Sequence, residues 1–147
     1  MNTIRIQHQD FDIGAETDAL ANGRNDIGAV VTFTGHVRGD AGLTALAVEH
    51  YPGMTEREIA SHVHEAEQRW PLTGVTIIHR IGRLEPGVRI VLVATASSHR
   101  QAAFAAAEFL MDYLKTRAPF WKEEECGDSK SWVAAKDTDE DAVRRWR

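Results

Sequence analysis

Two Val- and Ile-rich segments in the middle of the chain, 75–81 and 88–96, are joined through Glu85-Pro86-Gly87. Their composition is typical of β-strands, and a proline followed by a glycine is typical of the turn between two paired strands. Strands joined by so short a connection run antiparallel, because a parallel pair needs a crossover of about a dozen residues or more. The pair therefore excludes a purely parallel sheet and predicts a mixed α+β fold.

Strand and helix patterns alternate along the rest of the chain. Further strands are predicted at 3–7, 28–37, 43–51 and 131–135, and from Phe120 onward. Helices are predicted at 15–21, 55–70 and 98–115, with a charged terminal helix or tail from Thr138. Capping boxes are predicted for the second and third helices, from Thr55 with Glu58 and from Ser98 with Gln101. The chain has no repeat or long linker, which predicts a single domain over residues 1–147.

Composition limits the classes of protein to which the chain can belong. With 147 residues, of which 43% are hydrophobic, it is long enough to bury a core without disulfides or metals. Its net charge of −5 argues against general binding of nucleic acid, which needs a basic excess. It has a single cysteine, no apolar signal core at its N-terminus and no run long enough to cross a bilayer. We therefore expect a cytoplasmic protein without an internal disulfide.

The third predicted helix ends at a proline-containing break. Its alanine-rich part carries Phe104, Ala107 and Leu110 on one stripe, which predicts that this stripe packs on the core. Lys115 falls near the C-terminal end of the helix. Residues 116–119 then break the helix, because a proline disfavours helical geometry at the residue before it and cannot donate a backbone hydrogen bond.

Basic residues lie on both sides of this break. Lys115 precedes it, Arg117 lies within it, and Lys122 follows it on the predicted strand. These three cations are interleaved with aromatic residues in a chain that is otherwise acidic, which predicts a pocket for an anion. Solvated side chains at the ends of a helix and a strand are the alternative, and for any single lysine that alternative is the commoner one.

Two other segments could also bind an anion. His99 and Arg100 lie where a strand gives way to a helix, so the free backbone N–H groups, the helix dipole and the guanidinium would favour a phosphate or a carboxylate. A plain helix N-cap with exposed side chains remains the alternative. His36, Val37 and Arg38 close another strand between two glycines, which let the backbone approach a ligand closely.

Five segments of the chain, in this order, carry a resemblance to a known family: GHVRG, ALAVEHYPGMTE, RWPLTGVTIIHRIG, ASSHR and MDYLKTRAPFWK. Together they resemble the large, catalytic subunit of molybdopterin synthase over nearly the whole chain. The resemblance implies an α/β hammerhead fold with an additional antiparallel sheet. It also implies a homodimer within a heterotetramer, in which each end carries a small ubiquitin-like subunit whose Gly-Gly C-terminus is a thiocarboxylate.

The activity that the resemblance implies is that of a sulfurtransferase in molybdenum cofactor biosynthesis. Two sulfurs pass from the thiocarboxylate of the small subunit to cyclic pyranopterin monophosphate, which forms the dithiolene of molybdopterin. No cofactor, nucleic acid or membrane is expected to take part. Cys126 has acidic neighbours at 123–125 and 128, which disfavour a thiolate, so we expect the sulfur to come from the partner.

The resemblance also assigns residues. Lys115 and Lys122 match the two active-site lysines of the family, and neighbouring cations disfavour the charged form of a lysine, which makes proton transfer plausible. As a hypothesis, Lys115 transfers protons and polarises the attacked carbon, while Lys122 orients the thiocarboxylate or an acyl intermediate. Arg38, His99 and Arg100 match the positions that hold the anion, and the arginine fork suits phosphate.

The full set of expected substrate-binding residues is His36, Val37, Arg38, His99, Arg100, Arg117, Glu123, Glu124 and Lys136. Lys136 stands where the family often has an arginine that reaches the neighbouring protomer's pocket, so the charge is kept and the fork is lost. His36 stands where the family often has threonine. For Glu124, a solvated acidic turn is the alternative.

A metal site is not expected, and a different function remains open. His62 and His64 are two residues apart on a helix and point to different faces, and no set of His, Cys and Asp residues has zinc spacing. The alternative function is a non-catalytic module that binds an anion, a nucleotide or the acidic tail of a partner, in regulation or assembly. Such a module would need the same basic residues, and only turnover separates the two.

Overall fold

The computed structural model describes residues 2–133 and 137–147, and the strands within these ranges form two four-stranded sheets. The order across the first sheet is β1 (Asn2–Gln7), β4 (Leu72–Arg80), β6 (Arg89–Ser97) and β2 (Ala29–His36). The order across the second sheet is β5 (Gly82–Leu84), β3 (Ala45–His50), β7 (Phe120–Cys126) and β8 (Ser129–Trp132). The helices in the described ranges are α1 (Ile13–Ala21), α2 (Met54–Arg69), α3 (Arg100–Thr116) and α4 (Asp137–Arg144).

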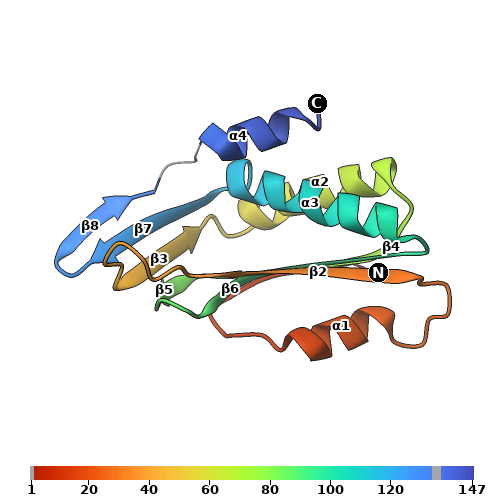
Figure 1. The fold of residues 1–147 in the computed structure, drawn as a ribbon, viewed down its shortest axis with the longest axis horizontal. Helices are drawn as coiled ribbons and strands as arrows, with labels where there is room; N and C mark the ends of the chain where they lie inside the picture. Colours follow the sequence, from red (N-terminus) through yellow and green to blue (C-terminus); the bar gives the residue numbers. More distant parts are fainter. Residues whose placement is uncertain (1, 134–136) are drawn as a thin grey trace.

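The first sheet is covered on both faces (Figure 1). α1 lies against one face, while α2 and α3 lie side by side against the other. Val75 and Ile77 of β4 belong to the core cluster on the α2 and α3 side, whereas Ile78 packs with Phe11 and Leu92 in a separate cluster. Burial on both faces explains why the sequences of β4 and β6 are almost continuously apolar instead of alternating.

The predicted antiparallel pair is confirmed, although its connection is longer than a tight hairpin. β4 and β6 run antiparallel, with Ile77 opposite Val93. The residues between them include β5, which leaves the first sheet and pairs with β3 in the second. Gly82 has a φ of 94°, a conformation that glycine adopts without strain, and the chain changes sheet at this residue. The connection between β4 and β6 therefore joins the two sheets.

The predicted fold class is also confirmed. β1 runs parallel to β4, so the first sheet is mixed, and all the pairs of the second sheet are antiparallel. An α+β fold with an additional antiparallel sheet results. The expected strand at 131–135 is β8, which ends at Trp132, and residues 134 and 135 lie outside the described ranges. No helix in the described part of the chain is both long and apolar enough to cross a membrane.

The two predicted capping boxes are wrong. α2 is capped two residues earlier, where the Glu56 carboxylate accepts a 2.9 Å hydrogen bond from the backbone N–H of Gly53. Thr55 is fully buried, and its hydroxyl donates to the carbonyl oxygen of Pro119. At the start of α3 the N-cap is His99, and the Ser98 hydroxyl donates to the carbonyl oxygen of Asp26. Both hydroxyl groups make tertiary contacts that the local sequence does not show.

The predicted core stripe of α3 is wrong for one residue. Ala107 and Leu110 are buried as expected, but the side chain of Phe104 is 62% exposed. The face that packs on the sheet carries the fully buried Ala103 and Ala106, whose small side chains let the helix lie close to β6 and β2. Phe104 therefore lies on the outer side of the helix, where it remains an exposed apolar residue.

The C-terminal segment is a helix rather than a tail, and it packs on α3. The indole of Trp146 lies edge-on to the rings of Trp70 and Phe109, and its Nε1 donates a 2.6 Å hydrogen bond to Asp112. The guanidinium of Arg145 forms ion pairs with Glu108 and with the same Asp112. Figure 1 shows α4 lying over α3, so these contacts fix it above the C-terminal half of that helix.

Candidate active site

The corner between α3 and β7 brings two lysines to one cleft. α3 ends at Thr116 and β7 begins at Phe120, with Pro119 between them as the sequence predicts. The Phe120 ring stacks on His79, with ring centroids 4.0 Å apart, which anchors the start of β7 to the first sheet. Lys115 comes from the last turn of α3 and Lys122 from β7, and both line the same cleft.

The cleft has three connected parts that share these lysines. One, of about 210 Å³, is bordered by Arg38 from the loop after β2 and by apolar residues of β3 and β6. A second, of about 280 Å³, extends toward α4 and is bordered by Asp139. A third, of about 60 Å³, lies toward the first sheet and is bordered by His36 and His79. Lys115 and Lys122 therefore stand at the centre of the cleft.

Burial changes the acid–base chemistry of Lys122. Its pKa falls from the usual 10.5 to about 8, chiefly because the side chain is removed from water and secondly because the charge of Lys115 lies nearby. The carboxylate of Asp139 acts in the opposite direction and is the weaker influence. A lysine with a pKa near 8 exists in both protonation states close to neutral pH, so it can give or take a proton.

The segment that carries Arg38 is fixed by backbone hydrogen bonds. The N–H of Val37 donates to the carbonyl oxygen of Val88 at 2.9 Å, and the N–H of Gly87 donates to the carbonyl oxygen of Val37 at 2.7 Å. Val37 itself is buried, so its contribution to the site is its backbone. Arg38 is exposed, and its Nε lies 3.8 Å from the carboxylate of Asp40, a surface pair that leaves the guanidinium free to meet a ligand.

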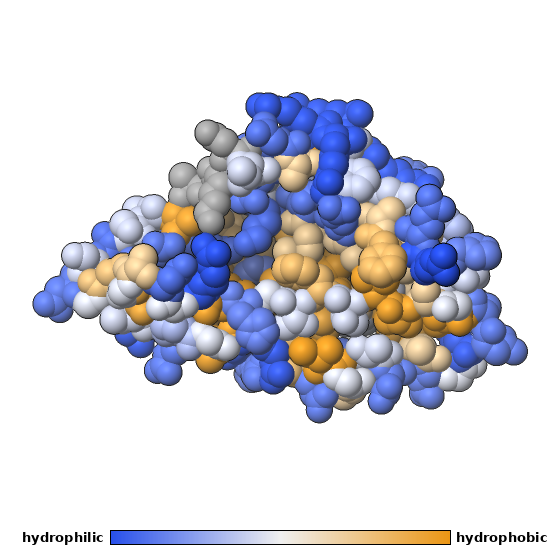
Figure 2. Space-filling view, viewed as in Figure 1, coloured by the Kyte–Doolittle hydropathy of each residue, from blue (hydrophilic) through white to orange (hydrophobic). Residues whose placement is uncertain are grey.

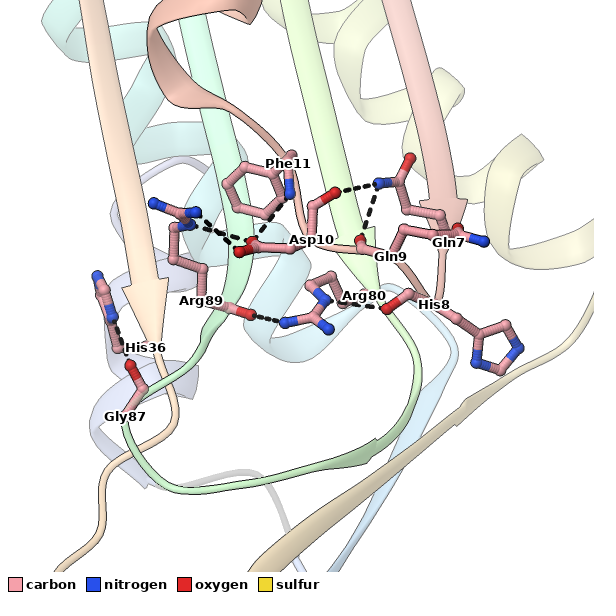
Figure 3. Close-up of polar contacts among 9 residues, drawn as sticks. All are labelled: Gln7, His8, Gln9, Asp10, Phe11, His36, Arg80, Gly87 and Arg89. Atoms are coloured by element: carbon pink, nitrogen blue, oxygen red, sulfur yellow. Dashed lines mark hydrogen bonds and ion pairs between the residues drawn. The ribbon is translucent and has the colours of Figure 1, made fainter.

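Polar contacts gather at the strand ends around His36 and Arg89 (Figure 3). His36 Nδ1 lies 3.2 Å from the carbonyl oxygen of Gly87, and Arg89, opposite His36 in the sheet, pairs with Asp10 at 2.7 Å. This pair lowers the pKa of Asp10 to about 2. The guanidinium of Arg80 donates to the carbonyl oxygens of His8 and Arg89. These contacts join the loop before α1 to the strand ends beside the cleft.

The acidic residues after Lys122 alternate between two faces of β7. Glu124 lies on the same face as Lys122 and borders the cleft, whereas Glu123 pairs with Trp132 on the other face. Cys126 also borders the cleft, at the end of β7 and on the face of Lys122. The sequence predicts acidic surroundings for Cys126. In the structure, however, the alternation of side chains along β7 places Glu123 and Glu125 on the opposite face of the strand from Cys126. Cationic side chains also border the cleft.

Besides Glu123, three expected substrate-binding residues in the described part of the chain are not at this cleft. Arg117 forms a 3.1 Å ion pair with Glu140, which ties the end of α3 to α4. His99 and Arg100 are exposed at the opposite end of α3, and a helix rises about 1.5 Å per residue, so Arg100 lies about 22 Å from Lys115 along the axis. Lys136 lies outside the described residues. The assignment of all four to substrate binding stays a prediction.

Two groups at the cleft, His79 and Asp139, are not among the residues expected from the sequence. His79 interrupts the apolar run of β4, and a histidine inside such a strand was the available signal. Asp139 lies on α4, and nothing in the local sequence shows that this helix returns to the lysines. Within the described part of the chain, no group of three or more His, Cys, Asp or Glu side chains could hold a metal ion.

Comparison with known proteins agrees with the resemblance seen in the sequence. The family model described as MoaE protein matches residues 6–117. The molybdopterin synthase catalytic subunit of Mesorhizobium japonicum is 59% identical over 99% of this chain and 93% of its own length. The structure of the molybdopterin biosynthesis MoaE protein from Burkholderia ambifaria is 52% identical, with a TM-score of 0.87 over 99% of this chain and 98% of its own.

A more distant solved structure preserves the same fold. The X-ray structure of molybdopterin synthase from Staphylococcus aureus is 33% identical, with a TM-score of 0.80 over 88% of this chain and 95% of its own. The match therefore extends over most of the chain and is not confined to one motif. On the family model and on relatives that are similar along almost its whole length, the chain belongs to the MoaE protein family.

Proposed function

We propose that this chain is the catalytic subunit of a molybdopterin synthase, which transfers sulfur from the thiocarboxylated C-terminus of a small ubiquitin-like subunit to cyclic pyranopterin monophosphate. The observation that carries the proposal is the convergence of Lys115, Lys122 and Arg38 on one cleft, with the pKa of Lys122 lowered to about 8. The names of the relatives support it, since the chain spans nearly the full length of molybdopterin synthase catalytic subunits.

The charges in the cleft suit the proposed reactants. The thiocarboxylate and the cyclic phosphate are both anions, so a site that brings them together needs cations to offset their repulsion. Arg38 is exposed at the mouth and can bind phosphate through its fork, while Lys115 and Lys122 meet the thiocarboxylate within the cleft. Because Lys122 has the lowered pKa, it shares in the proton transfer that the sequence analysis gives to Lys115 alone.

The proposed sulfur transfer has two steps. The thiocarboxylate sulfur attacks a carbon of the substrate and displaces an oxygen from it. A carbon–sulfur bond forms as the carbon–oxygen bond breaks, the leaving oxygen takes up a proton, and the small subunit is joined to the substrate through an acyl–sulfur bond. Water then cleaves that bond, so the sulfur stays on the substrate and the small subunit leaves with an ordinary carboxylate. The attacking water must lose protons and the departing groups must gain them. A lysine that is partly neutral can carry out both proton transfers. A second donor supplies the second sulfur.

The position of His99 and Arg100 suggests how the proposed homodimer completes the site. Both residues lie at one end of α3 and the lysines at the other, so a two-fold axis across the middle of the helix would place the His99 end of one copy beside the lysine cleft of its partner. Apolar residues gather along β2 in Figure 2, and Phe33 and Phe104 are 40% and 62% exposed. We propose that a second copy covers this face.

A turnover experiment separates this proposal from a non-catalytic anion-binding module. The chain is incubated with the thiocarboxylated small subunit and cyclic pyranopterin monophosphate, and molybdopterin is measured by mass spectrometry. The control is the same small subunit with an ordinary carboxylate at its C-terminus, which binds but carries no sulfur. The proposal expects product with the thiocarboxylate only. Tight binding of both partners without product would establish the binding module instead.

A further inference from the structure

His79 is a buried histidine beside the lysines, with only 4% of its surface exposed. It lies on β4 and faces the α2 and α3 side of the first sheet, in line with Ile77 and Val75. One face of its ring stacks on Phe120. His79 also borders the 60 Å³ hollow that Lys115 and Lys122 border. An imidazole at the inner end of a cationic cleft is available to interact with those lysines.

The backbone determines which ring nitrogen of His79 carries the proton. Nδ1 lies 2.8 Å from the carbonyl oxygen of Arg80, and because a carbonyl oxygen only accepts, Nδ1 must donate. That carbonyl is on a fixed residue, since the Arg80 guanidinium is itself bound to the carbonyl oxygens of His8 and Arg89 (Figure 3). Nε2 therefore keeps its lone pair, and within the described part of the chain the ring makes its side-chain hydrogen bond through Nδ1.

The surroundings also keep the ring uncharged. Burial lowers the pKa of His79 to about 3, and the charges of Lys122 and Lys115 and the neighbouring His50 add to this effect. At neutral pH His79 is therefore an acceptor and carries no proton on Nε2. A neutral acceptor beside two ammonium groups can take a hydrogen bond from them without adding to their mutual repulsion.

The hollow between these groups has room for water. A volume of about 60 Å³ exceeds the ~10–15 Å³ that one water needs, and such a water requires two or more polar partners. His79 Nε2 can accept from it and the Lys122 ammonium can donate to it. We propose that His79 is a positioning residue of this site, whose Nε2 holds a water in the hollow and through that water accepts a hydrogen bond from Lys122. The inference deepens the proposed function, because it concerns the lysine assigned to proton transfer.

Several titratable groups face Lys122 and must be considered in any test. They are Lys115 of α3, Asp139 of α4, Glu124 and Cys126 of β7, His36 of β2, His79 of β4, and Arg38 and Asp40 of the loop after β2. His50 of β3 acts on the charge of His79. A useful substitution at His79 must therefore leave these charges unchanged and remove only the acceptor.

The water can be tested directly in the wild-type chain. A high-resolution crystal structure of the chain alone should show a water within hydrogen-bond distance of both His79 Nε2 and Lys122 Nζ. A structure with no water in the hollow, or with a water that contacts only one of the two, would overturn the inference. This measurement needs no variant and does not depend on whether His79 substitutions fold.

Two substitutions test the effect on Lys122. His79→Phe keeps a flat ring against Phe120 and removes Nε2, whereas His79→Gln keeps an acceptor and loses the ring. The pKa of Lys122 is followed by NMR in protein labelled with ¹³C-lysine, with Lys122→Arg used to assign the signal. In His79→Phe it should fall from about 8 by about 0.5 to 1, because the ammonium loses one hydrogen bond. In His79→Gln it should stay near the wild-type value.

The outcomes separate positioning from a structural role. If His79 only fills space, both variants lose thermal stability and neither moves the pKa of Lys122, which would contradict the inference. His62→Phe is the matched control, because His62 also stacks on an aromatic ring, that of Tyr113, but does not border the cleft. All these measurements use the chain without donor or substrate. Their results therefore do not depend on whether the chain transfers sulfur.

Discussion

The hydroxyl of Thr55 donates a 2.9 Å hydrogen bond to the carbonyl oxygen of Pro119, although the two residues are 64 positions apart in the sequence. The same hydroxyl accepts a 3.0 Å hydrogen bond from the backbone N–H of Tyr51. Thr55 is fully buried, so its hydroxyl depends on these two contacts and not on solvent. One side chain thus joins the start of α2 to the corner that places Lys115 and Lys122 at the same cleft.

Removing this hydroxyl should therefore destabilise the protein. Thr55→Val keeps the shape of the side chain and leaves the part-buried N–H of Tyr51 and carbonyl oxygen of Pro119 without their partner. We expect a loss of about 1 to 3 kcal/mol in the free energy of unfolding, measured by urea denaturation. Thr55→Ser is the control, because it keeps the hydroxyl. A Val variant as stable as the Ser variant would show that the bond does not hold the corner.

Lys122 should reduce stability at neutral pH. Its pKa is about 8 in the folded chain and near 10.5 when unfolded, so the unfolded state binds more protons between these values and stability rises with pH across that window. Lys122→Met removes this effect. We expect it to exceed wild type by about 1 to 3 kcal/mol at pH 7, with a difference that shrinks from pH 8 to 10.5. Lys130→Met, at an exposed position, serves as control.

The two lysines should nevertheless be needed for turnover. If either transfers protons, Lys115→Met and Lys122→Met each lower molybdopterin formation by about two to four orders of magnitude. Binding of the small subunit should change little, because the substitutions leave the surface around the cleft intact. Single-turnover kinetics and calorimetry measure the two quantities. Near-normal turnover in both variants would remove the catalytic assignment.

Mixed dimers test whether His99 and Arg100 act on the partner's cleft. Arg100→Ala and Lys122→Ala are each expected to be poorly active alone. A heterodimer of the two contains one cleft with an intact lysine and an arginine from its partner. In an equal mixture half of the dimers are heterodimers, and one of the two clefts in each heterodimer is intact. About a quarter of the wild-type turnover should therefore return. If no activity returns after verified subunit exchange, Arg100 does not complete the cleft of a second copy.

Local patterns in the sequence were enough to predict the elements and the corner. Apolar runs identified β4 and β6, and Pro119 marked the end of α3, because these signals depend on residues close together in the chain. The lysines could be paired for the same reason, since only a few residues separate them. The expected reaction, sulfur transfer, came from the resemblance to a known family and not from these local patterns.

Features that depend on distant contacts could not be predicted. Thr55 and Ser98 lie in sequences typical of helix caps. Their hydroxyl groups instead donate hydrogen bonds to the carbonyl oxygens of Pro119 and Asp26. Phe104 falls on an apolar stripe, but alanines form the buried face because the helix lies close to the sheet. The separation of Arg100 from Lys115 follows from the length of α3, and its use in a site requires a second copy of the chain. Asp139 reaches the cleft only because α4 folds back.

The origin of the product sulfur tests the account most directly. A small subunit carrying ³⁴S in its thiocarboxylate is mixed with the unlabelled chain and cyclic pyranopterin monophosphate in a single turnover, and the product is analysed by mass spectrometry. The account predicts that every sulfur added to the substrate carries the label. Unlabelled sulfur in the product would contradict it, because the sulfur would then come from this chain, where Cys126 borders the cleft.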